Sequence, residues 1–212
     1  ATITDLGINN ATVFWNLSSK ELSQIALDKG QAKITSQGAI AINTGEFTGR
    51  SPMDRFIVKD EVTKNHVWWG DVNQSFDENK FDQLHKKVIN YLNDKELYVR
   101  DAYACADLKY KMNIRVVNEY SWSNLFAYNM FLRPNDEEIQ NFTPEWTILN
   151  APGFLADPKL DGTRKHNFAI LNFTKKIILI GGTGYTGEIK KGIFSALNFI
   201  LPHQKNVLSM HC

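Results

Sequence analysis

The chain has 212 residues, of which 43% are hydrophobic and 12% aromatic, and this is enough apolar material for a well-buried core. Its 24 basic and 23 acidic residues leave a net charge of +1, so no long-range field attracts nucleic acid or an anionic membrane. Two cysteines, Cys105 and Cys212, do not make a disulfide framework, and the opening ATITDLGINN lacks the layout of a secretory signal. No apolar stretch reaches the roughly 20 residues of a membrane span. We therefore expect a cytoplasmic protein that binds neither nucleic acid nor membranes.

Three helices are predicted in the first two thirds of the chain. The first covers residues 18–29 and begins with SSKE, a capping-box pattern headed by Ser18. The second runs from about 75 to 93 and begins with a similar match, SFDE. The third covers residues 123–132 and ends before Pro134.

Strands are predicted where β-branched and aromatic residues lie between turn formers. These segments are residues 38–45, 54–60, 113–120, 146–152, 166–173, 175–182 and 206–212. The pattern indicates an α/β fold, with mixed α+β character, built as a single domain around a mixed β-sheet.

The end of the chain is the best-defined unit. A strand at 175–182, a Gly-rich turn, a helix at 188–201 and a strand at 206–212 follow in the order of a βαβ unit, whose two strands are parallel. The helix should pack on the sheet through an apolar stripe made of Ile189, Ile193, Leu197 and Ile200.

The Gly-rich turn GTGYTG, Gly182 to Gly187, matches the dinucleotide pattern G-x-G-x-x-G. A dinucleotide site also needs a carboxylate about 20 residues further on, to bind the ribose hydroxyls. The segment NVLSMHC at that place contains none. A nicotinamide-dependent oxidoreductase is therefore a minor alternative.

An anion site is the stronger interpretation of the same turn. The start of the helix and the end of the following strand lie at one edge of the sheet, which should bring together Tyr185, Lys190, Lys191 and His211. Two lysines at the positive end of a helix dipole reduce stability unless an anion offsets them. We expect a ligand with a phosphate or carboxylate group, with a metal ion on His211 as a further option. Taken one by one, the lysines could equally be solvated and the histidine structural.

A second loop, residues 42–58, joins two predicted strands and carries Arg50 at its centre. The planar fork of an arginine suits bidentate binding of a carboxylate, and the neighbouring Gly49 lets a ligand approach closely. An ordinary surface arginine in a hairpin is the alternative at this position.

Six blocks of the sequence, in the same order, resemble the N-terminal portion of ATP-dependent phosphoenolpyruvate carboxykinase. They are TGEFTGRSPMDRFIV, YVRDAYACAD, IRVVNEYSWSNLFAYNMFLRP, NFTPEWTILNAPGF, GGTGYTGEIKKGIFSALNFILP and VLSMHC. The resemblance extends from about Leu6 to the last residue and implies that residues 1–212 form the N-terminal, substrate-binding domain. It also implies the gluconeogenic conversion of oxaloacetate and ATP into phosphoenolpyruvate, ADP and CO2, with Mn²⁺ at the active site and Mg²⁺ on the nucleotide.

The resemblance assigns roles to single residues. Arg50 would bind the substrate carboxylate or the departing CO2, Tyr185 would contact substrate, and Lys190 would direct positive charge toward it. Lys191 and His211 resemble the family's metal-binding lysine and histidine, which would also face ATP. Arg50, Lys190 and Lys191 are thus the expected catalytic residues, and Lys191 would also touch substrate.

The sequence departs from the family in one respect. A phosphate-binding loop of the type G-x-x-x-x-G-K-[ST], and the acidic residues that complete the metal site, are not found in it. We therefore expect a truncated form that lacks the C-terminal nucleotide-binding domain and, by itself, neither turns over oxaloacetate nor binds ATP specifically. A non-catalytic anion-binding or interaction module derived from the family is the alternative.

Overall fold

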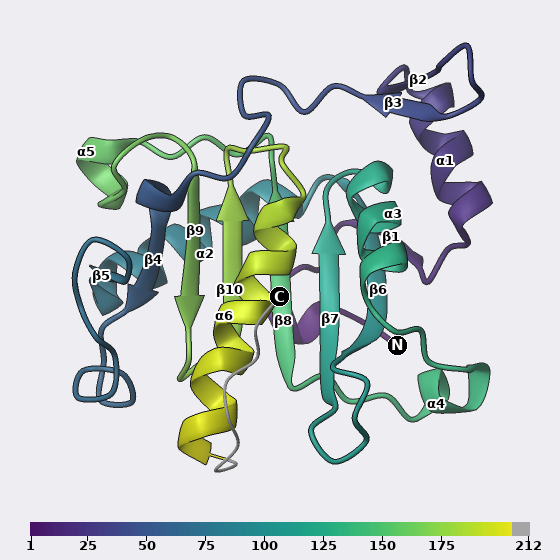
Figure 1. Cartoon of the computed structure of the whole chain (residues 1–212). Helices are drawn as coiled ribbons and strands as arrows, with labels where there is room; N and C mark the ends of the chain where they lie inside the picture. Colours follow the sequence, from purple (N-terminus) through teal and green to yellow (C-terminus); the bar gives the residue numbers. More distant parts are fainter. Residues whose placement is uncertain (205–212) are drawn as a thin grey trace.

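The computed structural model of the chain describes residues 1–204, which form a mixed α/β structure (Figure 1). An eight-stranded sheet has the order β1-β6-β7-β8-β10-β9-β4-β5, and β2 and β3 form a separate two-stranded sheet. The strands are β1 (Thr12–Trp15), β2 (Ala32–Ile34), β3 (Ile40–Ile42), β4 (Arg55–Val58), β5 (Gln74–Phe76), β6 (Glu96–Ala104), β7 (Met112–Asn118), β8 (Trp146–Ala151), β9 (Phe168–Asn172) and β10 (Ile177–Gly181). The helices are α1 (Ser19–Asp28), α2 (Glu78–Leu92), α3 (Ser121–Met130), α4 (Asp136–Gln140), α5 (Pro158–Asp161) and α6 (Gly187–Gln204), with short 3₁₀ turns η1 (Thr4–Leu6) and η2 (Pro52–Asp54).

The large sheet is mixed, as the sequence predicts. β6 runs antiparallel to β7, and β9 runs antiparallel to β10, while the other neighbouring strands are parallel. β7, β8 and β10 therefore point the same way, so the turns that follow them emerge at one edge of the sheet. The long connection from β3 to β4 crosses that edge in Figure 1.

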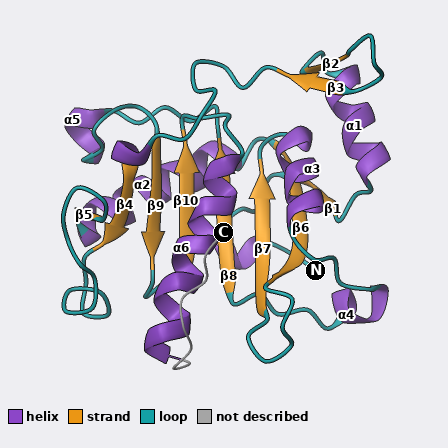
Figure 2. Ribbon diagram, viewed as in Figure 1, coloured by secondary structure: helices purple, strands orange, loops and turns teal. Residues whose placement is uncertain are grey.

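Helices cover both faces of the large sheet (Figure 2). Successive strand residues point to opposite faces, so Leu179 packs in the cluster that contains Phe81 and Val88 of α2, and Ile178 packs in the cluster beneath α6. The predicted apolar stripe of α6 is confirmed for three positions, which are at most 4% exposed: Ile189, Ile193 and Leu197. Ile200, the fourth, is half-buried.

Local signals predicted the first helix correctly, and the second and third less well. Ser18 caps α1 in a complete capping box, in which its hydroxyl accepts from the Glu21 amide and the Glu21 carboxylate accepts from the Ser18 amide. The predicted start of α2 is wrong: Ser75 belongs to β5, and Asp77 caps the helix by accepting from the Lys80 amide. The third helix begins and ends two residues earlier than predicted.

Other differences lie at the ends of the chain. α6 continues to Gln204 rather than ending at 201, and contains Pro202. A proline this near the end of a helix removes only one late hydrogen bond. The predicted final strand, residues 206–212, lies outside the described residues, so the parallel pairing of the βαβ unit stays a prediction.

Four strands were not predicted, and the longest of them, β6, spans nine residues. Its centre carries Arg100 and Asp101. These charged residues interrupt the run of hydrophobic residues that would predict a strand, although both are buried. The predicted strand at 38–45 exists as β3, but it pairs with β2 instead of joining the large sheet. Within residues 1–204, no helix combines the length and apolar character needed to cross a membrane.

His85 on α2 should make stability depend on pH. Burial lowers the pKa of His85 below its usual value of 6.5, and the charge of Lys175 lowers it further, against an opposing effect of Asp82. The unfolded chain therefore takes up the proton first, so the free energy of unfolding should fall as pH decreases below about 6.5. A His85→Gln variant should lose part of this decline in urea titrations between about pH 7 and pH 5. Identical slopes for the two proteins would contradict the assignment.

Candidate active site

A cavity of about 680 Å³ lies beside the start of α6. It is lined by four of the five residues predicted for the site: Arg50, Tyr185, Lys190 and Lys191. The rest of its wall comes from α3, from α6 and from the turn before α6: Phe126, Met130, Thr186, Gly187, Phe194 and Asn198. The fifth predicted residue, His211, lies outside the described residues.

The glycines of the turn before α6 are needed because protein atoms approach them closely. A Cβ on Gly182 would lie 2.4 Å from the His166 carbonyl oxygen, and one on Gly184 would lie 2.6 Å from that of Thr44. Gly182 also has a φ of +70°, which favours glycine. In a dinucleotide site the second glycine of the pattern instead leaves room for the pyrophosphate. Here the main chain at Thr44 occupies that space, which weighs against the dinucleotide alternative.

Tyr185 is held between this turn and the helix. Its backbone amide donates to the Thr183 hydroxyl at 3.1 Å, and a Cβ on Gly187 would lie 2.3 Å from its ring. The Glu188 amide donates to the Tyr185 carbonyl at 3.4 Å and the Ile189 amide to the Thr186 carbonyl at 3.0 Å, and these bonds begin the helical hydrogen bonding. The first amides of a helix have no intrahelical acceptor, so the rim of the cavity carries the positive end of the α6 dipole.

Sequence reasoning missed Glu188, which joins the two predicted loops. The Glu188 side chain is 3% exposed, and its carboxylate accepts from the Ser51 amide at 3.1 Å and from Arg55 Nε at 3.0 Å. Ser51 follows Arg50 directly, so this contact ties the arginine loop to the helix that carries the lysines. The only feature of the sequence that marked Glu188 was its position in the first turn of a predicted helix, where the helix dipole favours an acidic side chain.

A second contact holds the other end of the arginine loop. Asp54 is buried and forms a bidentate ion pair with Arg164, with both N–O distances at 2.9 Å, and it also accepts from Asn167 at 3.3 Å. The Arg50 side chain itself is exposed toward solvent. The main chain on its C-terminal side is therefore anchored twice, while the guanidinium stays available to a ligand.

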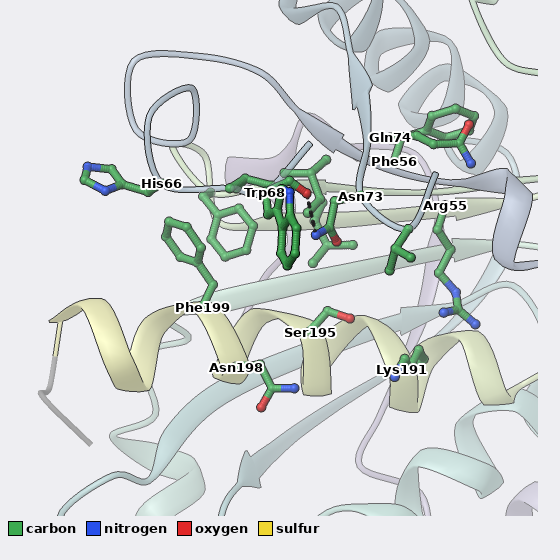
Figure 3. A pocket seen from close by; sticks show the side chains of 15 residues that line it. Arg55, Phe56, His66, Trp68, Asn73, Gln74, Lys191, Ser195, Asn198 and Phe199 are labelled. Carbon is green, nitrogen blue, oxygen red and sulfur yellow. Dashed lines mark hydrogen bonds between the residues drawn. The ribbon is translucent and has the colours of Figure 1, made fainter. Parts of the chain in front are cut away.

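A neighbouring cavity of about 350 Å³ shares Lys191 and Asn198 with the first (Figure 3). The two cavities thus meet at Lys191. Arg55 and Lys191 lie at one end of the second cavity in Figure 3. Trp68, from the connection between β4 and β5, faces a later part of α6, and its carbonyl accepts from the Asn73 side chain at 3.0 Å.

The charge of the first cavity suits an anion. Three cationic side chains line it and no carboxylate does, and the Lys191 ammonium lies 5.4 Å from the centroid of the Phe194 ring, within cation–π range. Among residues 1–204, no three His, Cys, Asp or Glu side chains are grouped so as to hold a metal ion. The described part of the site offers lysine nitrogens but no histidine, cysteine or carboxylate ligand, which does not fit a divalent cation by itself.

Comparisons with known proteins show which sequences the chain resembles. The family model described as phosphoenolpyruvate carboxykinase matches residues 11–212. Phosphoenolpyruvate carboxykinase (ATP) of Christiangramia forsetii is 66% identical over 211 residues, and that of Flavobacterium johnsoniae is 63% identical, each covering 100% of this chain and 40% of the relative. The protein of the same name from Bacillus subtilis is 49% identical over 198 residues, 93% of this chain and 37% of the relative. The chain thus spans about 40% of the length of these relatives.

Proposed function

Because the chain belongs to the phosphoenolpyruvate carboxykinase family, we propose that it forms the substrate-binding part of an ATP-dependent carboxykinase of the cytoplasm. The proposed reaction converts oxaloacetate and ATP into phosphoenolpyruvate, ADP and CO2. One observation carries the proposal: the cavity that collects Arg50, Tyr185, Lys190 and Lys191 is lined by cations and by no carboxylate. Oxaloacetate and phosphoenolpyruvate both carry carboxylate groups.

The side chains have separate tasks in this proposal. The guanidinium of Arg50 binds a substrate carboxylate with two parallel hydrogen bonds, and the Tyr185 hydroxyl donates a third. Loss of CO2 leaves negative charge on the enolate oxygen, and Lys190 and Lys191 stabilise that charge in the transition state. The helix dipole acts in the same direction. Phosphoryl transfer to the enolate then depends mainly on positioning and on neutralising charge.

The predicted Mn²⁺ site needs ligands beyond residues 1–204. Mn²⁺ bound by His211 and by the neutral form of Lys191 would take the place of the Lys191 charge next to the enolate oxygen. The described residues do not fit a divalent cation on their own, so no step of the proposed reaction is assigned to the metal ion. Binding of ATP with Mg²⁺, and the expected lack of activity of the 212-residue chain by itself, likewise stay predictions. A non-catalytic module with the same anion site would bind carboxylates equally well and remains the alternative.

Calorimetry with oxalate tests the carboxylate site on which the proposal depends. Oxalate has two coplanar carboxylates and so resembles the enolate formed from the substrate. It should bind the purified chain at a single site. Acetate at the same ionic strength should give no comparable heat, since it cannot bridge Arg50 and the lysines. Reduced nicotinamide cofactor, added in a separate fluorescence titration, should show no binding. Equal heats for oxalate and acetate would contradict a built dicarboxylate site.

A further inference from the structure

Glu188 lies two residues before Lys190 but contacts a different part of the molecule. Its carboxylate is almost fully buried and accepts one hydrogen bond from the Ser51 amide and one from Arg55 Nε. These partners are 137 and 133 residues away in the chain. One oxygen of the carboxylate thus binds the arginine loop at its main chain, directly beside Arg50.

The ion pair between Glu188 and Arg55 leaves one nitrogen of the arginine without a hydrogen bond, which is unfavourable for a contact that serves stability alone. Nη2 of Arg55 is buried and has no hydrogen-bond partner among the described residues. A buried ion pair commonly stabilises a fold no better than apolar side chains of the same size, because desolvation opposes the attraction. The bond to the Ser51 amide is the contact that such apolar side chains could not replace.

The other anchor of the loop cannot perform the same task. Asp54 ties the loop to Arg164 and Asn167, which precede β9, and neither residue lies on the helix with the lysines. Among the hydrogen bonds of residues 1–204, only those of Glu188 join the loop of Arg50 to α6. The packing of the Thr44 main chain against Gly184 lies on the N-terminal side of Arg50, so on its C-terminal side the distance between the guanidinium and the two lysines depends on this carboxylate.

We infer that Glu188 is a positioning residue that holds Arg50 in register with Lys190 and Lys191, so that all three reach the same anion. The inference rests on the proposed function, because the ligand that needs this register is the substrate carboxylate. Glu188 itself is not among the residues that line the cavity.

A double-mutant cycle separates positioning from a general effect on the fold. Glu188→Gln should weaken oxalate binding about tenfold in the presence of Arg50, and less than about twofold in an Arg50→Ala background. A second variant, Glu188→Met combined with Arg55→Met, removes both charges and the tether while keeping the buried volume, and should behave in the same way. Glu145→Gln is the matched control, because Glu145 also accepts a backbone amide, that of Asn113 at 2.8 Å, at the opposite edge of the sheet. It should leave oxalate affinity unchanged. Equal weakening in both Arg50 backgrounds would overturn the inference.

Backbone dynamics give a readout that does not depend on a ligand. The ¹⁵N order parameters of the Arg50 and Ser51 amides should fall in both Glu188 variants, while those of β9 stay as they are. If the wild-type chain binds no oxalate, the proposed function fails, and these order parameters alone decide the inference. Unchanged values at Arg50 and Ser51 would refute it, whatever the result with oxalate.

Discussion

Removing the charges of Arg50 and Lys191 together, as Arg50→Gln with Lys191→Met, should lower oxalate affinity roughly 100-fold. A hydrogen bond to a charged group contributes about 1.5–3 kcal/mol, so losing two of them costs at least about 3 kcal/mol. Both residues line the same cavity from separate elements, the loop before β4 and the first turns of α6. Calorimetry or competition with a fluorescent dicarboxylate would measure the change.

The control must remove the same net charge elsewhere. Lys20 and Lys86 are exposed on α1 and α2, and neither lines the cavity. Lys20→Gln with Lys86→Gln should therefore change oxalate affinity by less than about twofold at physiological ionic strength, where distant surface charges are largely screened. A loss comparable to that of the Arg50 and Lys191 variant would mean that oxalate responds to net charge instead of to a defined site.

The parts of the site that the sequence predicts are those set by local geometry. A helix that follows a strand of a parallel pair begins at the carboxyl edge, so Tyr185, Lys190 and Lys191 had to meet there. Arg50 was predicted from the chemistry of its loop, and the structure adds that the β3–β4 connection passes over the same edge. Glu188 was missed because its role depends on Ser51 and Arg55, and no local pattern marks contacts over so many residues.

The same distinction explains the errors in the fold. Ser18 was identified as a helix cap because the whole signal lies within four residues. SFDE predicted a helix that begins at about Ser75, but the structure uses Asp77 as the cap because Ser75 is already paired in β5 with Ile57 of β4. Strand β6 was missed because its charged residues are buried through partners on other elements. Pairing between distant strands, and not the local sequence, decided both outcomes.

The largest stability effect should come from the ion pair inside β6 and β7. Asp101 and Arg115 lie directly opposite each other in the antiparallel register, with N–O distances of 2.7 and 3.0 Å, and they are 2% and 6% exposed. The Arg115 guanidinium also lies 4.9 Å from the ring of Trp15 on β1. Asp101→Ala leaves this cation buried without its partner, and should lower the free energy of unfolding by about 3–5 kcal/mol. That is a large share of the roughly 5–15 kcal/mol that stabilises a typical domain.

Two further variants show whether burial causes the loss. Asp82→Ala removes an exposed pair with Lys175, at 2.6 Å, and should cost less than about 1 kcal/mol in the same urea titration. Asp101→Leu with Arg115→Met removes both charges, and should retain more stability than Asp101→Ala, because no unpaired ion is left in the sheet. If the double variant were the less stable of the two, the ion pair would contribute net stabilisation instead of merely compensating its own burial. The pair would then hold β6 and β7 in register by its energy as well as by its geometry.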